Sequence, residues 1–186
     1  MTNNRQVSFH DEALILVDGN DSVTGHSTKE QCHRGNGVLH RAFSIFVFNS
    51  KNELLIQKRS AEKPLWPLFW SNSVCSHPRE GEDYPEALSR RLLDEVGLHL
   101  PVRFLFKFQY QANYKHLGAE NELCSVFSGR SDDLPIVNDS EIADWRYVSV
   151  DTLQDDIDVR PEQYTPWFKT ELQRIRKDFS NTIFTI

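Results

Sequence analysis

The 186-residue sequence lacks a long apolar run, an excess of positive charge and more than a few cysteines. Its longest apolar run, residues 42–48, is far too short to span a bilayer, and residues 1–6 contain no apolar segment of the kind that secretory signals require. The three cysteines cannot all pair within the chain, so we expect free thiols in a reducing cytoplasm. Because 27 acidic residues outnumber 21 Lys and Arg, for a net charge of −6, we expect no general binding to nucleic acid or to membrane surfaces.

The sequence does contain enough apolar material for a packed core. Hydrophobic residues make up 39% of the chain and aromatic residues 11%, which is typical of globular proteins and not of disordered ones. The length is that of one domain, and the sequence shows no internal repeat and no linker. We therefore expect a single domain spanning residues 1–186.

Apolar patterns predict strands along much of the chain. Residues 41–48 form a nearly continuous apolar run, which is typical of a strand covered on both faces. Residues 104–110 alternate aromatic side chains with others, the period of a half-exposed strand. Further strands are predicted at residues 12–17, 53–58, 122–127 and 144–150, whereas residues 24–37 and 59–72 are predicted to be loops.

Two helices are predicted, so the fold class is α+β. The first covers residues 89–96, begins near Pro85 and ends at Gly97. It is expected to place Leu88, Leu92, Leu93 and Val96 on one side and to form the ion pairs Arg90–Asp94 and Arg91–Glu95. The second is an amphipathic helix over residues 165–179, with Pro166 in its first turn.

Two short segments concentrate reactive side chains. Cys75 lies two residues before His77 in the segment Asn-Ser-Val-Cys-Ser-His-Pro, and Glu120 lies two residues before Glu122. In a strand, residues two apart point to the same face, so each pair can share one side of a sheet. If the two strands are neighbours, a metal site and a reactive thiol can occupy one pocket.

Each of these residues also has an ordinary structural interpretation. A cysteine in an apolar strand is usually a small buried hydrophobe, which we favour for Cys32 and Cys124 but not for Cys75. Taken alone, Tyr110 can simply be a core residue, and Trp167 at a helix start is most often a packing residue.

Residues 76–98 resemble the Nudix signature G-x5-E-x7-R-E-U-x-E-E-x-G-U, in which U is aliphatic. The matching positions are Glu82, Arg90, Leu92, Glu95, Gly97 and Leu98, with Asp94 as a conservative match. Ser76 replaces the first glycine and Arg91 replaces the first helical glutamate. The resemblance implies a Nudix-like α/β/α sandwich, a mixed sheet flanked by helices, whose hydrolase box has lost one magnesium-binding glutamate.

The chain as a whole resembles the type 1 isopentenyl-diphosphate delta-isomerases. The motifs that carry the resemblance are His33 and His40, residues 72–78, the degenerate box, Tyr110, Glu120-Asn-Glu122 and Thr165-Pro-Trp167. They follow one another in a single order between residues 12 and 170 without large gaps. The resemblance implies conversion of isopentenyl diphosphate to dimethylallyl diphosphate by metal-dependent protonation and deprotonation through a carbocation-like intermediate.

The resemblance also implies a role for particular residues. An octahedral site for manganese, magnesium or zinc is expected from His33, His40, His77, Glu120 and Glu122, and Glu95 is expected to hold a magnesium that arrives with the diphosphate. The implied acid/base pair is Cys75 and Glu122, assisted by Tyr110, while the Trp167 ring stabilises positive charge. The implied diphosphate ligands are Lys29, Arg59, Lys63, Arg91 and Ser76. The direction of proton transfer stays open, with the Glu122 and Tyr110 side favoured as donor and Cys75 as acceptor.

Two other functions stay open at this point. A Nudix-type diphosphate hydrolase would leave Cys75 without a role, and a non-catalytic metal- or diphosphate-binding domain would be expected to lack a catalytic position. The expected partner is a small allylic or homoallylic diphosphate, and the site does not require an oligomer. Residues 1–10 and 177–186 lie outside the resemblance and predict no function.

Overall fold

The computed structural model describes residues 4–179 and 183. Within these residues, one nine-stranded sheet is built from β1 (Ala13–Val17), β2 (Val23–Thr28), β3 (His40–Phe48), β4 (Glu53–Arg59), β5 (Trp70–Ser71), β6 (Val74–Ser76), β7 (Val102–Tyr114), β8 (Gly118–Arg130) and β9 (Ile142–Ser149). The helices are α1 (Lys29–Cys32), α2 (Tyr84–Arg91), the π-helix η1 (Leu92–Val96), α3 (Val150–Val159), the 3-10 helix η2 (Pro161–Gln163) and α4 (Pro166–Asp178).

Strand β3 is the centre of the sheet. It pairs in parallel with β8 along its whole length, from His40 opposite Glu122 to Phe48 opposite Arg130. Its other partners, β1, β4 and β6, run antiparallel to it. The mixed sheet follows from these pairings, and β3 is buried on both faces as its continuous apolar run predicts.

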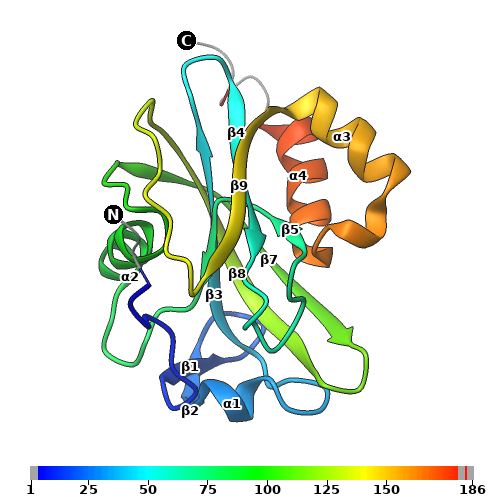
Figure 1. Cartoon of the computed structure of the whole chain (residues 1–186). Coiled ribbons are helices and arrows are strands. Elements are labelled where there is room, and N and C mark those ends of the chain that lie inside the picture. Colours follow the sequence, from blue (N-terminus) through cyan, green and yellow to red (C-terminus); the bar gives the residue numbers. More distant parts are fainter. Residues whose placement is uncertain (1–3, 180–182, 184–186) are drawn as a thin grey trace.

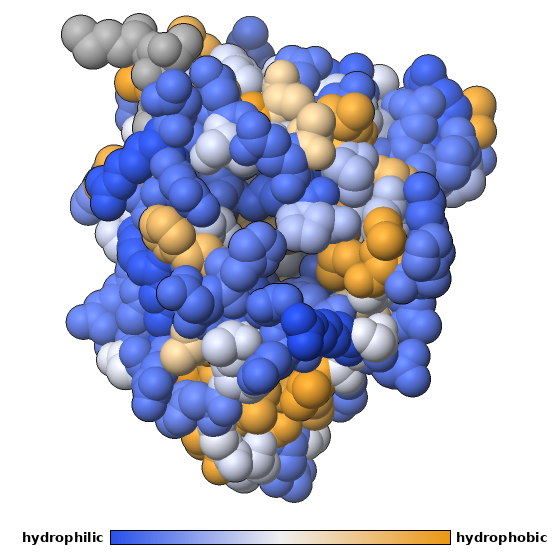
Figure 2. All heavy atoms as spheres, turned by 60° about the horizontal axis from the view of Figure 1, so that its bottom comes forward, coloured by the Kyte–Doolittle hydropathy of each residue, from blue (hydrophilic) through white to orange (hydrophobic). Residues whose placement is uncertain are grey.

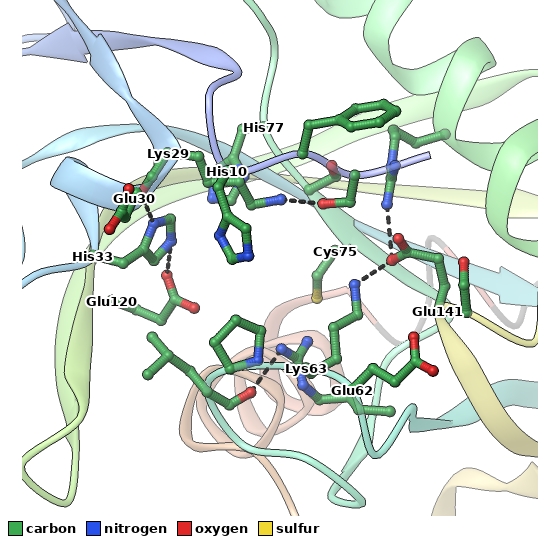
Figure 3. A pocket seen from close by; sticks show the side chains of 18 of the residues that line it. His10, Lys29, Glu30, His33, Glu62, Lys63, Cys75, His77, Glu120 and Glu141 are labelled. Carbon is green, nitrogen blue, oxygen red and sulfur yellow. Dashed lines mark hydrogen bonds and ion pairs between the residues drawn. The ribbon is translucent and has the colours of Figure 1, made fainter. Parts of the chain in front are cut away.

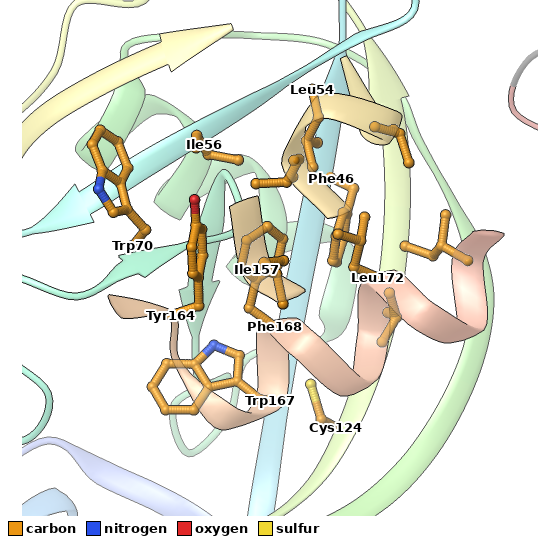
Figure 4. Close-up of a cluster of buried hydrophobic side chains, with 14 of the residues drawn as sticks. Phe46, Leu54, Ile56, Trp70, Cys124, Ile157, Tyr164, Trp167, Phe168 and Leu172 are labelled. Atoms are coloured by element: carbon orange, nitrogen blue, oxygen red, sulfur yellow. The ribbon is translucent and has the colours of Figure 1, made fainter. Parts of the chain in front are cut away.

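Helices cover both faces of the sheet, which confirms the α/β/α sandwich (Figure 1). On one face, Phe43, Ile45 and Val47 of β3 pack in a cluster with Leu88 and Leu92. On the other face, the neighbouring residues Phe46 and Phe48 pack in a second cluster with residues of α3 and α4 (Figure 4). None of the helices in the described part of the chain is long and apolar enough to cross a membrane.

The first predicted helix exists, but its second half is wound differently from the prediction. Asp83 caps α2 in a reciprocal capping box with Glu86, and the chain leaves η1 through Gly97 at φ 66°, where an added Cβ would lie 2.9 Å from the Ile136 carbonyl oxygen. The π turn adds a residue per turn, so side chains no longer follow the 3.6-residue period. Leu93 is consequently 57% exposed, and its predicted place on the buried side was wrong.

The two predicted ion pairs of this helix have different outcomes. Arg91 does pair with Glu95, four residues on, at 2.8 Å. Arg90 instead donates from Nε and Nη2 to Glu82, at 2.6 and 2.7 Å, so its predicted pairing with Asp94 was wrong. A two-bond fork on one carboxylate fits the planar guanidinium better than a single contact along the helix.

Four other predictions need correction. The predicted loop of residues 59–72 contains the short strand β5 at Trp70–Ser71. The predicted loop of residues 24–37 contains most of the edge strand β2 and the single turn α1, because neither has an apolar pattern strong enough to show in the sequence. Val150 begins α3, which was not predicted, after the Ser149 cap instead of ending a strand. The alternation over residues 104–110 is interrupted by a bulge between Phe104 and Phe106, which leaves Phe104 exposed. The second predicted helix, over residues 165–179, matches α4 to within one residue at each end.

Candidate active site

Five potential metal ligands converge at one end of the central strands. His33 follows directly after α1, His40 begins β3, and His77 follows directly after β6. Glu120 and Glu122 lie on β8, where Glu122 is opposite His40 in the parallel ladder. One ligand atom from each of these five residues lies within 4.8 Å of the others. The structure therefore brings together all five residues that the sequence grouped.

The imidazoles are oriented for ligation. The Nδ1 atoms of His33 and His40 lie 2.6 and 2.7 Å from the backbone carbonyls of Lys29 and Val38. A carbonyl that accepts the Nδ1 proton leaves the Nε2 lone pair for a metal, as in many protein metal sites. Nε2 of His40 is buried and has no hydrogen-bond partner among the described residues. Such an orphaned nitrogen is what a ligand for a cation requires.

The charges of the cluster also fit a divalent cation. Burial, and then the nearby His33, lower the pKa of His40 to about 4, so its ring is neutral at neutral pH. Burial and the charge of Glu120 raise the pKa of Glu122 well above its usual value. At Glu120 itself, the neighbouring His33 outweighs the effect of burial and lowers the pKa to about 2. At His33 burial is outweighed by the charge of Glu120, which raises the pKa of that ring. Three imidazoles and two carboxylates form a donor set suited to a divalent metal ion, which would replace the protons that His33 and Glu122 hold.

The thiol of Cys75 is surrounded by polar side chains on the sheet. Its S–H donates to Oδ1 of Asn72 at 2.7 Å, and Nε1 of Trp167 donates to Sγ at 3.0 Å. The hydroxyls of Ser44 and Ser71 lie 3.6 and 3.8 Å from the sulfur. Burial, and then the charge of Glu171, raise the pKa of Cys75 to about 12, so the group rests as a thiol.

Tyr110 and Glu122 form the second proton-carrying pair. Tyr110 is opposite Glu122 in the antiparallel β7–β8 ladder, and its hydroxyl donates to Oε2 of Glu122 at 2.6 Å. Burial and the adjacent carboxylate raise the pKa of Tyr110 well above its usual value. The phenol therefore keeps its proton and presents it to Glu122.

Both proton-carrying groups line one cavity of about 650 Å³. It is also lined by His33, Ser76, His77, Glu120 and Trp167. The space-filling view shows this face of the molecule hollowed near its centre, with a largely hydrophilic surround (Figure 2). Figure 3 shows the thiol of Cys75 facing into the cavity.

Four cations of the predicted diphosphate site, Lys29, Arg59, Lys63 and Arg91, line the same cavity. Arg59 donates to the carbonyls of Trp66 and Leu65, and its guanidinium lies 5.4 Å from the centre of the Trp167 ring. Lys29 donates to the hydroxyl of Ser8. Burial, and then the charge of Lys63, lower the pKa of Lys29 to about 8, although Glu12 and Glu141 act in the opposite direction.

Arg91 lines the cavity while held in a buried ion pair with Glu95, which does not line it. Glu95 is buried, does not belong to the cavity lining, and accepts from Nε of Arg91 at 2.9 Å. Arg91 is likewise buried, and its remaining nitrogens donate to the carbonyl of Val7 and to Glu141. For either residue to contact a diphosphate, this buried ion pair has to open.

The structure adds residues that sequence reasoning missed. Glu141, just before β9, lines the cavity and binds both Lys63 and Arg91, although nothing in its local sequence marks it. Ser8 and His10 also line the cavity, from a segment that predicted no function. Cys32 and Cys124 are buried, as their structural interpretation predicts.

The comparisons with known proteins agree with this geometry. The family model described as NUDIX domain matches residues 38–168. Isopentenyl-diphosphate Delta-isomerase 1 of Photorhabdus laumondii is 44% identical over 162 residues, covering 86% of this chain and 92% of that protein. Isopentenyl-diphosphate Delta-isomerase 1 of Aromatoleum aromaticum is 41% identical over 165 residues, covering 89% of this chain and 93% of that protein.

The chain belongs to the isopentenyl-diphosphate Delta-isomerase family. Solved structures agree with a NUDIX fold for this family member. The crystal structure of DR0079 from Deinococcus radiodurans superposes with a TM-score of 0.73 at 27% identity, covering 88% of this chain and 98% of that one. The MutT protein of Methanosarcina mazei Go1 superposes with a TM-score of 0.64 over 75% of this chain and 94% of that one, but at 15% identity it supports the fold alone.

Proposed function

We propose that this protein isomerises isopentenyl diphosphate to dimethylallyl diphosphate. The observation that carries the proposal is that one cavity is lined by a thiol, by a tyrosine bonded to a glutamate and by a cluster of four cations. The reaction adds a proton to the terminal alkene carbon and removes one from the saturated carbon attached to the internal alkene carbon. It therefore needs two proton-carrying groups beside a site for the diphosphate.

In the proposed reaction, Glu122 and Tyr110 deliver a proton to the terminal alkene carbon. Cys75, which has to be in its thiolate form for this step, removes a proton from the saturated carbon next to the other alkene carbon. The Tyr110 hydroxyl already points its proton at Glu122. At Cys75, the hydroxyls of Ser44 and Ser71 and the N–H of Trp167 face the sulfur, where hydrogen-bond donors stabilise the thiolate form that an acceptor needs. Burial opposes this effect and keeps Cys75 protonated in the protein without substrate. The direction of proton transfer therefore stays a prediction.

The histidine and glutamate cluster is proposed to hold manganese, magnesium or zinc. A bound divalent ion would supply positive charge that fixes Glu122 in one orientation and tunes its proton affinity. The residues themselves do the rest, since the backbone carbonyls of Lys29 and Val38 orient His33 and His40 toward the cluster. A second ion, magnesium brought by the diphosphate, is proposed to contact Glu95.

Charge stabilisation is assigned to the Trp167 ring. It lines the cavity and donates its N–H to Cys75, so its plane is held beside the thiol. A ring quadrupole favours a desolvated cation by roughly 2 kcal/mol or more. Arg59 already lies over this ring. A diphosphate that draws Arg59 away would free that face for the developing positive charge.

Several broader statements belong to the same proposal. All the residues assigned here come from one chain, so no second subunit is needed to complete the site. We further propose one functional domain, a cytoplasmic location, and a small allylic or homoallylic diphosphate as the partner, with no role for nucleic acid or membranes.

The decisive experiment is incubation with isopentenyl diphosphate in deuterated water, followed by mass analysis of the allylic product. An isomerase gives dimethylallyl diphosphate that carries solvent deuterium. A phosphate-release assay on a panel of nucleotides and other diphosphates runs in parallel, because a NUDIX hydrolase would release phosphate or pyrophosphate products. Hydrolysis without deuterium incorporation, or neither activity, would reject the isomerase function.

A further inference from the structure

Glu141 stands among the cations of the cavity and has no role in the function proposed above. Its carboxylate binds Lys63 (Figure 3). It also lies 3.1 Å from Nη2 of Arg91. The side chain is only 3% exposed and lines the cavity. Two residues predicted to clamp a diphosphate thus already share an anion that belongs to the protein.

This anion is permanently charged at physiological pH. Burial alone would raise the pKa of Glu141, but Lys63 and then Arg91 outweigh it and lower the pKa to about 2. The buried Glu95 contacts the same Nη2 of Arg91, at 2.8 Å. Arg91 is therefore compensated twice before any substrate arrives.

A diphosphate entering this site meets cations whose charge is already balanced. It has to displace Glu141 from Lys63 and Arg91, or share them with it. A free diphosphate carries several negative charges and is repelled by fixed carboxylates in a site that screens charge poorly. A diphosphate that carries a divalent cation has lost most of that charge, and its metal attracts the same carboxylates.

We propose that Glu141 is a specificity-determining residue: it is a counter-anion built into the diphosphate site, and it makes that site prefer a magnesium-bound diphosphate over the free anion. The inference rests on the proposed function, because it takes Lys63 and Arg91 as diphosphate ligands. It assigns Glu141 no bond to the metal and no step in the proton transfer.

A purely structural role for Glu141 predicts the opposite change in diphosphate affinity when its charge is removed. If the carboxylate only held Lys63 and Arg91 in place, its neutralisation would loosen both side chains and weaken the binding of every diphosphate. If it competes with the substrate, neutralisation frees both cations, and the free anion gains most. Unit charges about 6 Å apart at an effective dielectric constant of about 20 change an affinity roughly a hundredfold.

The test measures the binding of inorganic diphosphate by isothermal titration calorimetry, with and without added magnesium. The protein is used as purified, without chelator, and its bound metal is quantified before and after each titration. Glu141→Gln should bind magnesium-free diphosphate at least about tenfold more tightly than the wild type. The ratio of the affinities with and without magnesium should fall by at least about tenfold as well.

The matched control is Glu62→Gln, which removes the same charge at an exposed position of the cavity rim. Because exposed charges are screened, it should change the magnesium ratio by less than about twofold. Weaker binding of free diphosphate by Glu141→Gln, or an unchanged ratio, would overturn the inference. Glu141→Asn, a smaller neutral residue with the same expected ratio, replaces the Gln variant if that variant does not fold.

The failure of this inference is distinguishable from the failure of the proposed function. The isomerisation of isopentenyl diphosphate by the wild type is measured on the same preparation. Absence of isomerisation rejects the proposed function, whereas an active wild type with an unchanged magnesium ratio in Glu141→Gln rejects only the role of Glu141.

Discussion

Glu171 offers a quantitative test of the electrostatics beneath the active site. It lies on α4, is completely buried, and accepts a hydrogen bond from Sγ of Cys124 at 3.5 Å. Its Oε2 has no hydrogen-bond partner among the described residues. Burial raises the pKa of this carboxyl to about 8, well above its ordinary value of 4.5. At neutral pH the folded protein therefore keeps a proton that the unfolded chain has lost.

This difference makes stability depend on pH with a definite sign. Below pH 4.5, the pKa of this carboxyl in the unfolded chain, Glu171 is protonated in both states and does not change the free energy of unfolding. Between 4.5 and about 8 the folded state binds more protons, so the free energy of unfolding falls as pH rises. The slope approaches about 1.4 kcal/mol per pH unit, which gives a loss of about 2 kcal/mol between pH 6 and pH 8.

The perturbation is Glu171→Gln, which keeps the shape of the side chain and cannot ionise. Urea unfolding of the wild type and the variant at half-unit steps of pH gives the difference between their free energies of unfolding. Other groups titrate equally in both proteins, so that difference isolates Glu171 and should move by about 2 kcal/mol in favour of the variant from pH 6 to pH 8. Glu162→Gln, at an exposed position, should remain parallel to the wild type. Parallel curves for Glu171→Gln would refute the buried, protonated carboxyl.

Three further predictions concern the catalytic groups. Cys75→Ala should lower kcat by about 10²–10⁴-fold with little change in fold, whereas Cys32→Ala should keep most activity; a near-normal rate without the Cys75 thiol would contradict its role. His40→Ala should lower the divalent metal content measured by mass spectrometry, and full occupancy would mean that this histidine is structural. Trp167→Leu should lose far more in kcat than in affinity for isopentenyl diphosphate, while Trp167→Phe keeps partial activity; equal rates in the two variants would leave Trp167 a packing residue.

Much of the layered fold was predictable because its strongest patterns are local. The apolar run of β3 and the amphipathic spacing of α4 each reflect burial of residues that are close in sequence. Most of the elements that escaped prediction lack this signal. The exception is α3, whose buried Val150, Leu153 and Ile157 follow a helical spacing that was not recognised. Strand β2 is a largely exposed edge strand, α1 is one turn long, and the π turn of η1 depends on tertiary packing that no sequence period encodes.

The candidate site was predictable to the extent that its residues come in short motifs. Cys75 with His77, and Glu120 with Glu122, were grouped because residues two apart share a face of a strand, and the structure places all four on the cavity. Glu141 could not be found this way. Its partners lie 78 and 50 residues away along the chain, and its importance comes from their convergence in a buried space.

The parallel pairing of β3 with β8 also determines at which stage of folding the histidine and glutamate cluster can form. His40 and Glu122 face each other in that pairing although about 80 residues separate them, and every residue between has to be synthesised before they can meet. Parallel pairs of this kind form slowly, because the entropy of closing a long loop is lost before any contact compensates it. An ion that needs ligands from both strands can be captured only late in folding. Metal supply would then act on the yield of folded protein, because a bound ion withdraws the completed fold from the unfolding equilibrium.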